Sequence, residues 1–373
     1  MRVAPLFVSC LFALCGCSGS SGGDQPAPST DGGGDDSSST VDSGVTTAPP
    51  DSTTTTDAPA TTDADATTTT DAPSGDGDGG APGDTAPSGK RGFPAAAPWV
   101  SFYGTAAEMG DLAKVASTFR VINIDVDPGG GGNFTKAQIT QLRAGGTNRV
   151  ISYFNIGSCE NYRTYWKSAP GYVSCNDNKA AQRGPYDGYP DETWMDVGNA
   201  DYQKLMVEYV AQRLIDMGVD GFFLDNLEII EHGTATTNGP CDAKCAQGGL
   251  DLVRKLRERF PDALIVMQNA TSDVTLKGTT GGVSFPTLLD GISHEEVYAP
   301  TPDGTAEAQL VSWSSAGLKP GGHPFFIATE DYVGDCTKTT AAKSAYDKSR
   351  AHGFSPYATD ASAGQKVVCY WGF

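Results

Sequence analysis

Short runs rich in β-branched and aromatic residues recur eight times after residue 98, and helical periodicity fills most of the gaps between them. Strands that alternate with helices pair in parallel, and eight such units favour a closed barrel over an open doubly wound sheet, which is the alternative. The sequence therefore predicts a (β/α)8 TIM barrel as a single domain over residues 93–373. The predicted strands are residues 99–103, 121–127, 149–156, 219–225, 263–269, 291–297, 324–329 and 354–358.

The segments between these runs carry start and stop signals for helices. Thr135 and Gln138 form a capping-box pattern at the start of one amphipathic stretch. Asn199 precedes another stretch, whose apolar side chains recur on one face until Gly218 ends it. A third stretch stops before Pro261, as expected for a residue that cannot continue a helix.

The first 92 residues are predicted to lie outside this domain. Arg2 and a short apolar run lead to cysteines in a pattern that resembles a bacterial lipobox, so residues 1–17 are read as a lipoprotein signal peptide with Cys17 as the acylated residue. Residues 18–92 consist mainly of Ser, Thr, Asp, Pro, Gly and Ala, which bury too little apolar surface to fold. We therefore expect a disordered tether on an exported protein that is lipid-anchored to the cell envelope. An ordinary secretory signal is the alternative.

The charge of the domain argues against a nucleic-acid partner. From residue 91 onward, 24 basic side chains stand against 32 acidic ones, which gives a net charge of −8. No basic stripe offers the positive potential that binding to phosphates requires. An acidic excess of this kind suits a cationic partner.

The cysteines indicate a disulfide-stabilised, exported domain. Cys10, Cys15 and Cys17 belong to the signal peptide, and six of the nine cysteines remain. An even number in an exported domain is typical of disulfides, and we expect sequence neighbours to pair. The expected bridges are Cys159–Cys175, Cys241–Cys245 and Cys336–Cys369. A zinc site is the rival interpretation, but the four histidines are scattered without ligand spacing, so no metal or other cofactor is expected.

Polar side chains gather where the predicted strands end. In the run 121–127, the side chains of Asn123, Asp125 and Asp127 share one face, and the apolar side chains share the other. The carboxyl ends of all strands in a barrel meet at one mouth, where active sites lie. The polar strand ends are Asp125, Asp127, Asn155, Asp225, Asn269, Glu295, Glu296, Glu330 and Asp331.

The predicted mouth is rich in carboxylates and aromatic side chains. No Gly-x-Ser-x-Gly elbow is present, and the glycine run 129–132 lacks the lysine of a phosphate-binding loop. Two carboxyl groups suffice for glycoside hydrolysis, in which one protonates the leaving oxygen and the other attacks the anomeric carbon or activates water. Aromatic residues on the predicted loops would stack on sugar faces; they are Tyr103, Tyr162, Trp166, Trp194, Tyr298 and Tyr332.

Four segments carry a family resemblance: Val121-Ile-Asn-Ile-Asp-Val-Asp127, Ile151-Ser-Tyr-Phe-Asn-Ile-Gly-Ser-Cys-Glu160 with Tyr162-Arg163, Trp194-Met-Asp196, and Gly218-Val-Asp-Gly-Phe-Phe-Leu-Asp-Asn226. In this order they resemble the endo-α-1,4-polygalactosaminidases, glycoside hydrolase family 114, and related domains of secreted biofilm-exopolysaccharide proteins. The resemblance implies a TIM barrel that hydrolyses α-1,4-linked galactosamine chains. Cys159 and the pair Asn226-Leu227 depart from the family pattern.

The resemblance also implies two catalytic residues. The family's aspartate on the fourth strand falls on Asp225, and its glutamate on the sixth strand falls on Glu295. Gly291, Ser293 and Glu295 share a face suited to the barrel lumen. By analogy with other α-glycosidase barrels, Asp225 would be the nucleophile and Glu295 the acid/base of a retaining reaction. A slip of one residue at the strand end would give the acid/base role to Glu296.

The remaining candidates are assigned to substrate binding. Galactosamine that is not acetylated carries an ammonium group, which carboxylates at the mouth would complement. For Glu160 and Arg163, a structural ion pair is the alternative. The expected binding residues are Tyr103, Asp125, Asp127, Tyr153, Asn155, Glu160, Arg163, Trp194, Asp196, Asn269, Glu296 and Tyr298.

The sequence thus predicts an exported, monomeric glycosidase that acts on a cationic, galactosamine-containing exopolysaccharide. A non-catalytic glycan-binding lipoprotein with the same fold is one alternative. An α-glycosidase that acts on another α-linked glycan is the other. The presence of both catalytic carboxyl groups favours an enzyme over a binding protein.

Overall fold

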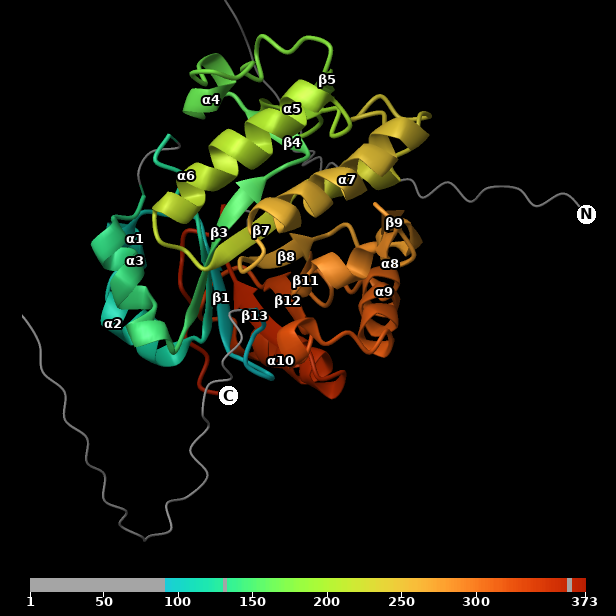
Figure 1. The fold of residues 1–373 in the computed structure, drawn as a ribbon. Helices are drawn as coiled ribbons and strands as arrows, with labels where there is room; N and C mark the ends of the chain where they lie inside the picture. The colour runs from blue at the N-terminus through green and yellow to red at the C-terminus, as the bar shows by residue number, and fades with distance from the viewer. Residues whose placement is uncertain (1–90, 130–132, 361–363) are drawn as a thin grey trace, which may run out of the picture. The chain divides into compact units, whose positions relative to one another are not determined.

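The computed structural model describes residues 91–129, 133–360 and 364–373. The predicted signal peptide, Cys17 and the tether up to residue 90 lie outside the described residues. Eight parallel strands form one sheet in the order β1-β2-β3-β7-β8-β11-β12-β13, and β13 lies against β1, so the sheet is nearly closed. Helices lie around the outside of the strands (Figure 1). This part of the chain is therefore a TIM barrel, as predicted.

Each barrel strand coincides with one of the eight predicted runs, with ends that differ by a few residues. The strands are β1 (Trp99–Phe102), β2 (Val121–Ile124), β3 (Arg149–Asn155), β7 (Gly221–Asp225), β8 (Leu264–Gln268), β11 (Gly291–Glu295), β12 (Phe326–Tyr332) and β13 (Ser355–Thr359). The α-helices are α1 (Ala106–Met109), α2 (Leu112–Thr118), α3 (Lys136–Leu142), α4 (Thr164–Lys167), α5 (Ala200–Lys204), α6 (Ala211–Asp216), α7 (Ala243–Arg259), α8 (Asp273–Leu276), α9 (Gly304–Ser315) and α10 (Thr339–Ala351). The other helical segments are the 3₁₀ turns η1 (Ala144–Gly146), η3 (Leu227–Glu231), η4 (Phe285–Leu288) and η5 (Pro320–Gly322), and the π-helical segment η2 (Leu205–Val210).

The predicted helix starts are confirmed. Gln138 N donates to Thr135 Oγ1, and Thr135 N donates in return to the Gln138 side chain, which completes the capping box of α3. Asn199 Oδ1 accepts a hydrogen bond from Tyr202 N at 3.0 Å and caps α5. From there α5, η2 and α6 follow one another without a break. The chain leaves α6 through Gly218, whose φ is positive.

Side chains in the barrel lumen change from apolar at the amino end of the strands to polar at the carboxyl end. At the amino end, the ring of Trp99 meets three other aromatic rings at centroid distances of 6.3, 6.2 and 6.0 Å, those of Phe223, Phe326 and Tyr357. Farther along the same strands, on the same face, come Ser101, Asp225 and Glu330. The apolar end therefore closes the lumen, and the polar end is left to form a site.

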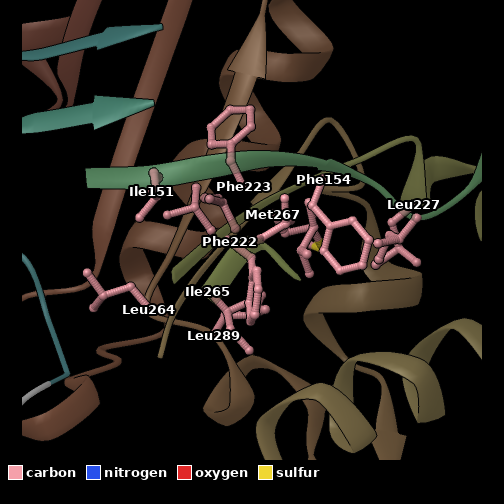
Figure 2. Packing of buried hydrophobic residues seen from close by; sticks show 14 of the residues in the cluster. Ile151, Phe154, Phe222, Phe223, Leu227, Leu264, Ile265, Met267 and Leu289 are labelled. Atoms are coloured by element: carbon pink, nitrogen blue, oxygen red, sulfur yellow. The ribbon is translucent and has the colours of Figure 1, made fainter. Parts of the chain in front are cut away.

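The outward faces of the strands supply the second half of the core. Figure 2 shows Phe222 and Phe223 pointing in opposite directions, with Phe154, Ile265 and Met267 gathered on the side of Phe222. All five side chains are buried. Burying a side chain of this size stabilises the fold by about 1.5–3 kcal/mol.

An inserted antiparallel sheet between β3 and β7 was not predicted. Its strands are β4 (Ser158–Glu160), β5 (Gln182–Tyr186) and β6 (Tyr189–Met195), in the order β4-β6-β5. Its strands are short or polar, and β5 contains Gly184 and Pro185 and pairs with β6 through an irregular register. Such residues carry little strand signal in sequence. A two-stranded pair, β9 (Thr279–Thr280) with β10 (Val283–Ser284), was missed for the same reason.

Three disulfides join the predicted pairs, Cys159–Cys175, Cys241–Cys245 and Cys336–Cys369. The third connects the segment after β12 to the C-terminal segment. Disulfides of this kind are typical of domains that work outside the cytoplasm. Among the described residues, no helix has the length and apolar character needed to cross a bilayer.

Candidate active site

A cavity of about 580 Å³ opens at the carboxyl ends of the barrel strands. Barrel strands and the residues just after them line one part of it, the inserted sheet lines a second part, and the C-terminal segment lines a third. The predicted residues on its wall are Tyr103, Asp125, Tyr153, Glu160, Arg163, Asp225, Asn269 and Glu295. Within the described residues, no three His, Cys, Asp or Glu side chains are grouped so as to hold a metal ion.

Asp225 is the last residue of β7 and lies opposite Asn155 of β3 in the strand register. Burial and the negative charges of Glu295 and Glu192 raise the pKa of Asp225 to about 8, and a hydrogen bond from Tyr153 opposes this rise. Asp225 therefore keeps a proton at neutral pH.

Glu295 is the last residue of β11 and is held by hydrogen bonds on both carboxyl oxygens. Asn269 Nδ2 donates to its Oε2 at 2.9 Å. Tyr332 Oη and Gln365 Nε2 both donate to its Oε1, the latter at 3.3 Å. Three donors from three different segments fix the orientation of this carboxyl group toward the cavity.

Gln365 comes from the C-terminal segment and was not predicted as a site residue. Its Oε1 accepts from Ser101 Oγ, its Nε2 also donates to Tyr332 Oη at 3.1 Å, and its backbone oxygen accepts from Tyr103 N at 2.9 Å. The side chain is fully buried. The Cys336–Cys369 disulfide holds the same segment four residues farther along. A lone glutamine in a loop carries no sequence signal of this role.

Glu296 takes a different position from Glu295. It follows the end of β11 with a φ of 54°, and its side chain is exposed. It lines an adjoining hollow of about 470 Å³, together with His294 and Asp303, and does not line the main cavity. Only Glu295 of the two shares a cavity with Asp225.

Arg163 lies at the centre of a buried ionic cluster. Its guanidinium group forms ion pairs with Glu160 at 2.7 Å, Asp125 at 2.9 Å and Asp127 at 3.6 Å, and Arg213 adds a second pair to Asp127 at 2.8 Å. These carboxylates are therefore already compensated by cations. The structural ion pair that was the alternative for Glu160 and Arg163 is the arrangement observed.

Six of the twelve predicted binding residues do not line the main cavity. Asp127 forms ion pairs with Arg163 and Arg213, and Asp196 forms one with Arg183. Trp194 is 1% exposed and stacks beneath Tyr186 at 4.1 Å between ring centroids. The six are Asp127, Asn155, Trp194, Asp196, Tyr298 and Glu296, and of these only Glu296 lines the adjoining hollow. A role of these side chains in substrate binding stays a prediction.

The inserted sheet contributes wall residues that the sequence did not reveal. Tyr186 and Tyr189 pack edge to face at 4.8 Å, and Tyr189 remains 45% exposed. Tyr162, one of the aromatic residues expected to stack on sugars, also lies on the wall and is 55% exposed. Glu192 lies on the same wall as the tyrosines. Tyr186, Tyr189 and Glu192 lie on the unpredicted strands β5 and β6, so their convergence depends on pairing between distant segments.

Comparisons with known proteins agree with this architecture. The model of glycoside-hydrolase family GH114 matches residues 86–280, which is more than half of the chain and includes Asp225 but not Glu295. An uncharacterized protein of Thermotoga maritima is 26% identical over 262 residues, covering 66% of this chain and 76% of that protein. Another, of Deinococcus radiodurans, is 25% identical over 244 residues, covering 61% and 70%.

A solved structure shares the fold. The glycoside hydrolase domain of PelA from Pseudomonas aeruginosa matches with a TM-score of 0.53 and 13% identity, over 73% of this chain and 96% of that domain. At this level of identity the likeness concerns the fold alone.

Proposed function

The chain belongs to glycoside hydrolase family GH114, and on this premise we propose that it hydrolyses α-1,4-linked, galactosamine-containing exopolysaccharide. The observation that carries the proposal is that Asp225 and Glu295, at the ends of β7 and β11, line one cavity. A pair of carboxyl groups that flank a cavity is what glycoside hydrolysis requires. The raised pKa of Asp225 keeps one proton in the site at neutral pH, and the proposed reaction needs that proton on Glu295 when Asp225 attacks.

In the proposed reaction, the Asp225 carboxylate attacks the anomeric carbon while Glu295 donates its proton to the leaving glycosidic oxygen. The bond to that oxygen breaks, and a glycosyl ester on Asp225 forms. Glu295, now ionised, takes a proton from water, whose oxygen attacks the anomeric carbon and releases Asp225. Tyr332, Gln365 and Asn269 act as positioning residues for Glu295. A separation of about 5–5.5 Å between the two carboxyl groups would match retention.

The cavity wall supports a cationic sugar chain as the substrate. Asp191 and Glu192 lie on it without an ion pair to any cation of the described residues, and exposed Tyr162 and Tyr189 offer faces for stacking on sugars. The domain also has an acidic excess, which attracts a polycation over a distance. We propose a monomeric enzyme that needs no cofactor.

The test is a panel of purified polysaccharides that includes galactosaminan, its fully N-acetylated form and other α-linked glycans. We expect new reducing ends and short oligosaccharides from galactosaminan, measured by a reducing-end assay and by product size. Cleavage of another α-linked glycan alone would identify the substrate alternative. Tight binding to galactosaminan with no new reducing ends would favour the non-catalytic binding protein.

The pH dependence of kcat/KM should report the carboxyl pair. The active form holds one proton, so loss of that proton removes the acid, and kcat/KM should fall as pH rises through about 8. Glu192 contributes to the raised pKa of Asp225, so in Glu192→Gln the fall in kcat/KM should occur at lower pH. If the fall occurs at the same pH in Glu192→Gln as in the wild type, another group, such as the substrate ammonium, controls it.

We also propose that Cys17 is acylated and that the domain acts from the cell envelope on a tether. Cys17→Ala should abolish lipid labelling and move the protein from the membrane fraction to the soluble fraction, because a diacylated cysteine would be the anchor. Labelling with a fatty-acid analogue and fractionation of the full chain measure this. Unchanged membrane association would contradict the lipobox interpretation.

A further inference from the structure

The side chain of Glu192 is held beside Asp225 by hydrogen bonds that all end on one carboxyl oxygen. Ser158 Oγ donates to its Oε2 at 2.5 Å, Asn155 Nδ2 at 3.0 Å and Asn226 Nδ2 at 3.1 Å. All three donors are buried neutral groups. The carboxyl group is therefore fixed in place, and its Oε1 has no hydrogen-bond donor among the described residues.

Glu192 also differs from Asp125 and Glu160, the carboxylates of this wall that form ion pairs. Asp125 and Glu160 are neutralised by Arg163 at 2.9 and 2.7 Å. Glu192 forms no ion pair with a lysine or arginine in the described part of the chain, although it is half-buried. A partly desolvated carboxylate without a counter-charge is a favourable partner for an ammonium group.

The local backbone places Glu192 next to the proposed nucleophile. Asn155 is the register partner of Asp225 across β3 and β7, and Asn226 directly follows Asp225 with a φ of 62°. The close approach of this turn depends on Gly157, since a Cβ there would lie 1.7 Å from the carbonyl oxygen of Asn226. Both asparagines that flank Asp225 thus bind the same oxygen of Glu192, and the two carboxyl groups belong to one rigid unit.

The structure of the sugar explains why a C2-binding group should lie near the nucleophile, as Glu192 lies near Asp225. Asp225 is proposed to attack C1, and in galactosamine the nitrogen is on C2, the adjacent carbon. A group that contacts the C2 substituent must therefore lie beside the nucleophile. We propose that Glu192 is the specificity-determining residue that binds the C2 ammonium of the sugar attacked by Asp225. This inference rests on the proposed function and adds which unit of the chain must be deacetylated.

The inference predicts selectivity at one position. An acetamide or a hydroxyl group at C2 carries no positive charge, so either would leave Glu192 half-buried and uncompensated. The enzyme should therefore require a free amine on the sugar that becomes the new reducing end. At sugars farther along the chain, which Glu192 does not reach, the enzyme should tolerate an uncharged C2 substituent more readily.

The experiment compares kcat/KM for an α-1,4-linked galactosamine tetrasaccharide with that for the galactose tetrasaccharide of the same linkage. The variants are Glu192→Gln, which keeps the size of the side chain, and Asp187→Asn as the matched control. Asp187 is an exposed acid of the same inserted sheet that does not line the cavity. Using the ratio of the two substrates removes any effect of Glu192 on the reactivity of Asp225, because that effect is common to both.

We expect the galactosamine-to-galactose ratio to fall roughly 10- to 100-fold in Glu192→Gln, the range for loss of one charge-assisted hydrogen bond. The ratio should change little in Asp187→Asn. An unchanged ratio in Glu192→Gln, or an equal fall in Asp187→Asn, would overturn the inference and leave the proposed function intact if the wild type still cleaves galactosamine chains. A wild type that cleaves both tetrasaccharides equally would overturn the inference alone, and a wild type that does not cleave the galactosamine tetrasaccharide would overturn both.

Discussion

Asp225→Asn and Glu295→Gln are expected to remove cleavage of galactosaminan while leaving the barrel folded. Both side chains end strands inside the cavity, and both changes keep the shape of the side chain. We expect Asp225→Asn to lower kcat by on the order of 10⁴-fold or more, as loss of a covalent nucleophile does in other hydrolases. We expect Glu295→Gln to lower kcat by roughly 10²–10⁴-fold, the usual contribution of general acid–base catalysis.

The two variants should differ on substrates with good leaving groups. Such a leaving group needs little protonation. Glu295→Gln should therefore form the glycosyl ester from an activated aryl glycoside at close to the wild-type rate, whereas Asp225→Asn should not. Initial rates on the polymer and on the aryl glycoside measure this difference. Thermal unfolding of each variant provides the control, because a folding defect would reduce both activities alike.

Two results would contradict the assignment. Wild-type cleavage by Asp225→Asn would exclude Asp225 as the nucleophile and would favour a different reaction. The acid/base signature in Glu296→Gln in place of Glu295→Gln would transfer that role to the exposed neighbour. Glu296 lines the adjoining hollow, so this second result would also move the scissile bond toward that side.

The barrel could be predicted from the sequence because its signals are local. Each strand is a short β-rich run, and alternation along it already separates the lumen face from the outer face, as at Asp225 and Glu295. The capping box at Thr135 needs only four consecutive residues. The disulfides also join the sequence neighbours that were expected to pair. Evidence of this kind does not depend on knowing which segments meet.

The rest of the site depends on segments that are far apart in the chain. Glu192 reaches the cavity because β6 pairs with β4, where its partner is Glu160, and Gln365 reaches Glu295 from 70 residues away. Pairing of this kind has no periodic signature in a single sequence. The same limit applies to Asp125 and Asp127, which looked free in sequence but meet Arg163 in the fold.

Arg163→Met is expected to lower the free energy of unfolding by about 3–5 kcal/mol at neutral pH, the usual cost of removing one partner from a buried ion pair. Arg163 is 3% exposed and pairs with Asp125, Glu160 and Asp127. Its removal leaves these buried carboxylates with less counter-charge. Denaturant unfolding of the domain at neutral pH measures the loss.

The pH dependence of that loss provides a second observation. Burial raises the pKa of Asp125, and Arg163 opposes the rise. In Arg163→Met this opposition is absent, so the pKa of Asp125 should rise further, and protonation should relieve the destabilisation as pH falls. The deficit relative to the wild type should therefore be largest at neutral pH and smaller in mild acid.

Lys343→Met is the matched control, because it removes a cation from an ion pair with Asp347 at 2.7 Å whose side chains are 54% and 59% exposed. A surface pair contributes at most about 1 kcal/mol, so this variant should unfold almost as the wild type does. The double variant Arg163→Met/Glu160→Met should recover part of the stability lost in Arg163→Met, since it removes a buried charge along with its partner. If Arg163→Met were as stable as the wild type, the cluster would not require its cation. Asp125 and Glu160 would then again be candidates for binding the ammonium groups of the substrate.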